Sequence, residues 1–271
     1  MKKILFNSTA LLIVLVLISG TVLRSCGEKE APELPPVSSM LMDFSDFEEG
    51  NQGAQKSTEG TYTNWLHAAG NVFAWNLITT VTMSIPVTAY ATALNVEPVY
   101  IGDNVWNWTY DFTVGSTTYS AKLVGTRISN AEFTMEMYIS AAGLLGFDEV
   151  LWFEGTIRYD HTHALWTLYE NPYDPSPLLT AEYNMDFEAD AYDIKYTNIR
   201  PENAENGSSI WYSYDPADTV YNSSYVITGS TNTINIEWDR VDKNGRVSDP
   251  AFYEDDLWHY WDVLLQDYYP E

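Results

Sequence analysis

The chain has 271 residues, of which 45% are hydrophobic, so it can bury a substantial core. It carries 38 acidic and 13 basic residues, for a formal net charge of −25, and 15% of its residues are aromatic. Nucleic-acid binding needs a basic patch, so this charge excludes that class of partner. The aromatic content excludes a wholly disordered chain.

The first 25 residues predict a signal peptide, which is set aside from the fold. Lys2 and Lys3 precede an apolar run over residues 4–23, and "LRSC" follows with Cys26, the one cysteine of the chain. A single cysteine allows no internal disulfide. An apolar run of this length could also remain uncleaved as a signal anchor that spans a bilayer.

The end of this run resembles the lipobox of bacterial lipoproteins, with Leu23 and Ser25 in the expected positions before Cys26. Arg24 departs from the small or apolar residue that is usual at its position. The resemblance implies cleavage before Cys26 and acyl chains on its sulfur and new amino group. The protein would then be attached to the bacterial outer membrane through these chains, and no other membrane contact is expected.

The segment after the cysteine, residues 27–39, is charged and rich in proline. It predicts a flexible acidic tether that extends over residues 26–60. Glu28 and Glu30 resemble the acidic export signals of lipoproteins displayed on the cell surface, although a solvated linker would have the same composition. The remaining chain, residues 61–271, is expected to fold as one unit.

A helical segment is predicted over residues 61–95. From residue 65 to residue 77, apolar residues recur every three or four positions, and Thr63 is a candidate N-cap. Pro86 could begin a second short helix. The β-branched run over residues 77–87 leaves a strand open as the alternative.

Residues 96–271 predict an antiparallel meander of about ten strands, because short alternating segments are separated by turns. One side of each segment is polar and the other apolar or aromatic, which is typical of a sheet with one buried face. The fold class is therefore mainly β, a barrel or half-barrel, with a two-sheet sandwich as the alternative. The helix would pack on the concave face. A helical spacing from Leu257 to Tyr268 predicts a short C-terminal helix. This order of elements loosely resembles the incomplete barrels of periplasmic lipoprotein carriers.

The concave side is the candidate site for an apolar, lipid-like ligand. Its residues are expected from three segments of alternating pattern: Trp106, Trp108, Tyr110, Phe112, Phe133, Met135, Met137, Tyr183 and Met185. The alternative is a filled core in a structural or interaction lipoprotein that binds glycan or protein through exposed aromatics. A transmembrane β-barrel would show the same alternation.

No motif predicts catalysis, a cofactor or a metal. His161 and His163 have a spacing that could ligate zinc or copper, but they lie on an expected hairpin turn, where solvated side chains are the simpler interpretation. A glycosidase would need two facing carboxylates, and no pair is marked by its sequence context.

Overall fold

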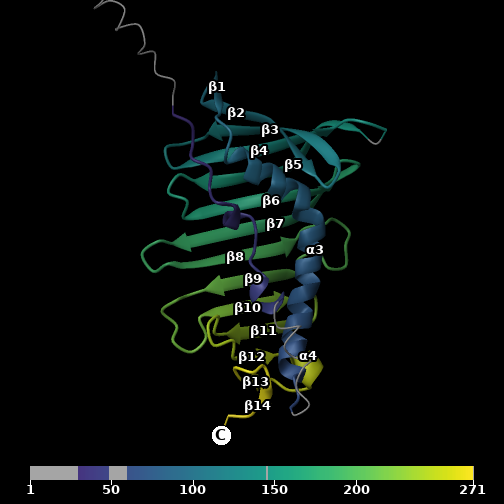
Figure 1. Cartoon of the computed structure of the whole chain (residues 1–271), viewed down its shortest axis with the longest axis vertical. Coiled ribbons are helices and arrows are strands. Elements are labelled where there is room, and N and C mark those ends of the chain that lie inside the picture. Colours follow the sequence, from purple (N-terminus) through teal and green to yellow (C-terminus); the bar gives the residue numbers. More distant parts are fainter. Residues whose placement is uncertain (1–29, 49–59, 145, 271) are drawn as a thin grey trace, which may run out of the picture. The chain divides into compact units, whose positions relative to one another are not determined.

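The computed structural model describes residues 30–48, 60–144 and 146–270, and residues 32–271 form one compact unit. A single antiparallel sheet of fourteen strands makes up most of it, with each strand paired to its neighbours in the sequence. The strands β1 and β14 are the two edges, so the sheet stays open, as the half-barrel prediction requires (Figure 1). The predicted fold class is confirmed, with more strands than expected.

The strands are β1 (Val99–Gly102), β2 (Val105–Val114), β3 (Thr117–Arg127), β4 (Glu132–Ala141), β5 (Phe147–Arg158), β6 (His163–Asn171), β7 (Asp174–Asp186), β8 (Ala191–Asn198), β9 (Ser209–Tyr214), β10 (Ser223–Thr228), β11 (Thr233–Trp238), β12 (Gly245–Ser248), β13 (His259–Trp261) and β14 (Asp267–Tyr268). The helical elements are η1 (Val37–Ser39), α2 (Ser45–Glu48), α3 (Thr63–Ala93) and α4 (Pro250–Tyr253).

Large and small residues alternate across the buried face of the sheet. In one row of paired positions Trp106 lies opposite Gly125, and further along the same row Gly155 lies opposite Trp166. A Cβ atom on Gly155 would lie 2.3 Å from Cε3 of Trp166, and one on Gly125 would lie 2.9 Å from Cζ3 of Trp108. These glycines therefore make room for the indole rings that cover them.

Helix α3 lies across the sheet and packs mainly at its two ends (Figure 1). Its first turns contact β12, β13 and β14, and its last turns contact β2 and β3. The carboxylate of Asp267 accepts hydrogen bonds from the backbone N–H groups of Thr63 and Asn64, at 3.0 and 2.9 Å. A distant strand thus satisfies the free N–H groups of the helix start, a role predicted for the Thr63 side chain.

The predicted break at Pro86 does not occur, because Pro86 lies inside one continuous helix. A proline in a helix interior removes one hydrogen bond and is costly by about 3 kcal/mol. Here Pro86, Ala89, Tyr90 and Ala93 are all buried at the end of α3 that packs on β2 and β3. This tertiary packing offsets the local cost.

Residues 32–48, which we call the strap, run along the same face of the sheet as α3 (Figure 1). The prediction of a flexible tether was wrong for this segment. Its apolar side chains Met40, Met42, Phe44 and Phe47 are buried. Met40, Met42 and Phe44 alternate with exposed residues, so this part of the strap buries one side as a strand does, and Phe47 follows in the short helix α2.

The predicted short helix near the C-terminus is α4, which lies earlier than the helical spacing indicated. Residues 257–268 instead contain β13, β14 and the turn between them. Asp262 accepts hydrogen bonds from the N–H groups of Leu264 and Gln266, both at 2.9 Å, and Leu265 has a φ of 66°. This turn chemistry, together with pairing of β13 to β12, outweighs the helical pattern.

Candidate functional site

Beneath the middle of α3, the structure leaves an apolar cleft of about 670 Å³. The helix lines it with Trp75, Leu77, Ile78, Val81 and Thr82. The opposite wall consists of Leu178 and Leu179 from β7 and of residues from the end of β8, from β10 and from the loops after these two strands: Asn198, Arg200, Asn203, Glu205, Ser208, Ile227, Thr228 and Gly229. An aliphatic floor and a polar rim therefore meet in one cleft.

The helix side chains in this cleft are unusually exposed for aliphatic residues. Leu77, Ile78 and Val81 have exposed fractions of 54%, 51% and 69%. By contrast, Leu178, Leu179 and Ile227 on the sheet side are buried. An exposed apolar surface that faces a concavity indicates a binding site rather than a core.

Helix α3 also has the length and apolar composition of a membrane-crossing helix, by those two criteria alone. Core helices of soluble proteins meet the same criteria. In this structure both ends of α3 pack on the sheet, and 28% of its most apolar window is buried. The part of the apolar surface of α3 that remains exposed forms one wall of the cleft.

Electrostatics at the cleft rim are set by one ion pair and one carboxylate. Arg200 donates from Nε and from a terminal guanidinium nitrogen to the two carboxylate oxygens of Glu170, at 3.0 and 3.1 Å. Its backbone is held in place by Asn198 and Asn206. Arg200 is therefore neutralised, and Glu205 carries the other charge among the described lining residues.

The sequence-predicted ligand residues lie elsewhere on the same face of the sheet. Seven of them are buried in its packing: Trp106, Trp108, Phe112, Phe133, Met135, Met137 and Tyr183. Tyr110 and Met185 are half-buried. None of the nine is among the described residues that line the cleft. Their binding of a ligand stays a prediction.

Tyr110 shows what the predicted residues face. Its hydroxyl donates to the backbone oxygen of Ala89 in α3 at 2.5 Å. Burial raises the pKa of Tyr110, so this hydroxyl keeps its proton. The aromatic side of β2 therefore packs against the helix.

Two tyrosines of the sheet hold the strap by its backbone. The Tyr196 hydroxyl donates to the oxygen of Met40 at 2.8 Å and accepts from the N–H of Met42 at 2.6 Å. The Tyr225 hydroxyl donates to the oxygen of Asp43. Burial raises the pKa values of both phenols, so both remain donors at neutral pH.

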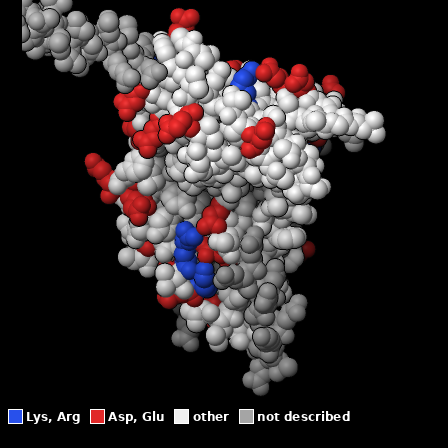
Figure 2. All heavy atoms as spheres, turned by 45° about the horizontal axis from the view of Figure 1, so that its top comes forward, with Lys and Arg blue, Asp and Glu red and all other residues white. Residues whose placement is uncertain are grey.

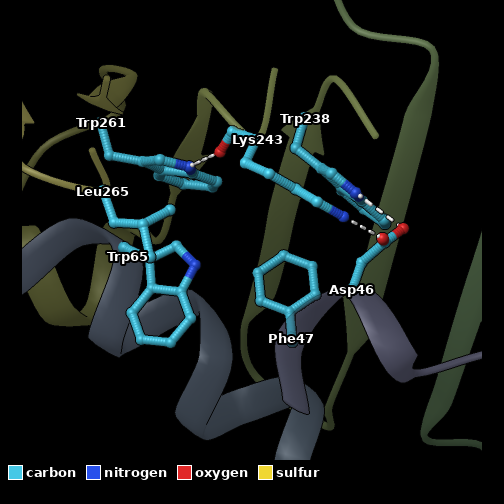
Figure 3. A pocket seen from close by; sticks show the side chains of 7 residues that line it. All are labelled: Asp46, Phe47, Trp65, Trp238, Lys243, Trp261 and Leu265. Carbon is cyan, nitrogen blue, oxygen red and sulfur yellow. Dashed lines mark hydrogen bonds and ion pairs between the residues drawn. The ribbon is translucent and has the colours of Figure 1, made fainter. Parts of the chain in front are cut away.

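A second, smaller hollow of about 180 Å³ lies where the strap, α3 and strands β11–β13 meet (Figure 3). It is lined by Asp46, Phe47, Trp65, Trp238, Lys243, Trp261 and Leu265. The four aromatic side chains are all buried. Asp46 pairs with Lys243 at 2.6 Å and with Arg240 at 2.9 Å. The side chains around this hollow therefore hold the strap against α3 and the sheet, and we do not interpret the hollow as a ligand site.

The histidine pair does not gather ligands in the described structure. His161 lies in the β5–β6 turn and His163 begins β6, where its Nδ1 lies 2.9 Å from Oδ1 of Asn184. Among residues 30–48, 60–144 and 146–270, no three His, Cys, Asp or Glu side chains are grouped so that they could hold a metal ion. Cys26, the predicted lipidation site, lies outside the described residues.

Sequence reasoning missed the cleft residues because they do not form a motif. One signal was present: the run over residues 77–87 has only aliphatic, hydroxyl, methionine and proline side chains, with no charged residue to turn toward water. A helix of that kind is usually buried all round. In a chain whose aromatic strands already fill the core, it predicts a helix with surplus apolar surface.

Comparison of the chain with known protein families, with characterised proteins and with solved structures finds no match.

Proposed function

We propose that this protein is a lipid-anchored lipoprotein of the bacterial cell envelope that binds a lipid-like apolar molecule in the α3 cleft. The observation that carries the proposal is the exposure of Leu77, Ile78 and Val81 over a cleft of about 670 Å³. Ligand sites commonly measure about 300–1,000 Å³, with apolar walls and a few polar groups. The cleft has this size and composition.

An alkyl chain is the ligand group that suits the cleft best. Its walls contribute aliphatic side chains from α3, β7 and β10, and the polar groups gather in the loops after β8 and β10. Burial of each CH₂ group is worth about 0.8 kcal/mol before the entropic costs of binding are subtracted. A chain of eight buried CH₂ groups would therefore gain roughly 6 kcal/mol.

The direct test measures binding of a fluorescent apolar probe, such as N-phenylnaphthylamine, to Val81→Gln. We expect this substitution to weaken probe binding about fivefold or more, because it places an amide in the apolar wall. Val81 is exposed, so the free energy of unfolding should change by only about 0.5 kcal/mol.

Leu66→Gln is the matched control. Leu66 is also exposed on α3, but it is not among the described residues that line the cleft. It should leave probe binding unchanged. Equal loss in both variants would mean that the probe binds the helix surface generally, and no probe binding by the parent protein would favour the filled-core interaction lipoprotein.

Anchoring is supported by the sequence alone, through the apolar run that ends at Cys26. We expect Cys26→Ala to abolish metabolic labelling with palmitate and to release the protein from membranes. The Cys→Ala change adds little bulk or charge, so it tests the thiol itself. Undiminished labelling of the variant would contradict lipidation at this residue.

A further inference from the structure

The charges at the rim of the cleft discriminate between classes of amphiphile. The two charged residues among its described lining are Arg200 and Glu205. Arg200 is paired with Glu170 through two hydrogen bonds, and both partners are partly shielded from water, with side-chain exposed fractions of 35% and 29%. The guanidinium is thus already committed to a carboxylate of the protein.

Glu205 differs in this respect. It is exposed in the loop that joins β8 to β9, and within the described part of the chain no basic group forms an ion pair with it. Its backbone N–H donates to Oδ1 of Asn203 at 2.8 Å, which fixes the loop and leaves the carboxylate at the rim. Glu202 adds a second carboxylate on the same loop.

The charge of the molecule as a whole is also negative. The full chain has a formal net charge of −25. Acidic side chains spread over the visible face in Figure 2, and the few basic side chains there lie next to acidic ones. A headgroup that approaches the cleft therefore meets a negative potential.

We infer that the cleft selects an amphiphile with a cationic headgroup, its alkyl chain against α3 and its charge near Glu205. The inference rests on the proposed alkyl-chain site and names the headgroup that this site prefers. An anionic headgroup such as a carboxylate would have to break the Arg200–Glu170 pair or face Glu205 unpaired. A cation needs neither change.

The test compares three compounds with one chain: decyltrimethylammonium, decyl maltoside and decanoate. Each is titrated calorimetrically into the purified protein at low and at high salt. We expect affinity to fall in the order cation, neutral, anion. The preference for the cation should shrink as salt is raised, because the rim charge is solvent-exposed and screened.

Glu205→Gln separates the local carboxylate from the overall charge. We expect it to weaken decyltrimethylammonium binding about three- to fivefold and to leave decyl maltoside unchanged, since one exposed charge contributes about that much. Glu188→Gln is the matched control. It removes the same charge from the β7–β8 turn, at the opposite end of β8 from the cleft.

The outcomes distinguish the two proposals. Decanoate that binds as tightly as the cation, or equal effects of Glu205→Gln and Glu188→Gln, would overturn the headgroup inference and leave the alkyl-chain site standing. Absence of binding by all three decyl compounds would overturn the alkyl-chain site, and the headgroup inference with it.

Discussion

Replacing Trp108 with alanine is expected to lower the free energy of unfolding by about 3–5 kcal/mol, the cost of truncating a close-packed aromatic. Trp108 is 2% exposed, and its ring covers Gly125 so closely that a Cβ there would lie 2.9 Å from it. Strand β3, which carries Gly125, is paired with β2 on one side and with β4 on the other. The cavity therefore has little freedom to collapse.

Trp258→Ala is the control, measured by urea unfolding under the same conditions. Trp258 is half-buried, and its ring lies 4.2 Å from the Arg246 guanidinium, a contact worth about 0.5–1 kcal/mol at exposed sites. It should destabilise the protein far less than Trp108→Ala. If Trp108→Ala lowers the free energy of unfolding only slightly but weakens probe binding, Trp108 lines an open cavity instead.

The second large effect is expected from the strap. A chain that begins at residue 32 should fold cooperatively, and a chain that begins at residue 49 should not. The shorter chain loses the burial of four large apolar side chains, Met40, Met42, Phe44 and Phe47, worth about 1.5–3 kcal/mol each. That sum is similar to the whole stability of an ordinary domain, about 5–15 kcal/mol.

Point substitutions make the same test within the full chain. Phe47→Ala should destabilise by about 3–5 kcal/mol, because the ring packs against Trp65, Tyr225 and Trp238. Leu41→Ala should cost much less, since Leu41 is exposed in the same strap. Cooperative unfolding of the chain from residue 49, with unchanged stability, would show that the strap is dispensable.

The β architecture could be predicted from the sequence because each strand carries its own signal. Trp106, Trp108 and Phe112 alternate with polar residues, and the structure buries all three. A period of two residues needs no knowledge of distant partners. The turns, including the one at His161, could likewise be predicted from the residue types between the alternating segments.

The remaining elements depend on contacts that no local pattern records. The strap carries the alternation Met40, Met42, Phe44, but it is short, acidic and begins with a proline-rich stretch, so composition favoured a tether. The start of α3 is capped by Asp267, more than two hundred positions away along the chain. Pro86 lies within a helix because its packing on the sheet outweighs its local preference. The cleft arises from the geometry of α3 against two loops, which tertiary structure alone determines.

The packing of the strap on the sheet also shortens the segment that would join the folded unit to a bilayer under the proposed lipidation. The compact unit begins at Pro32, so only residues 27–31 lie between it and Cys26, the proposed site of the lipid anchor. Fully extended, such a segment reaches about 20 Å at most, whereas a tether over residues 26–60 would reach roughly 120 Å. If it is anchored as proposed, the protein would meet only molecules at or just above its own membrane. It would remain in contact range of that membrane surface, and a ligand in a facing membrane would have to leave that membrane before it could bind.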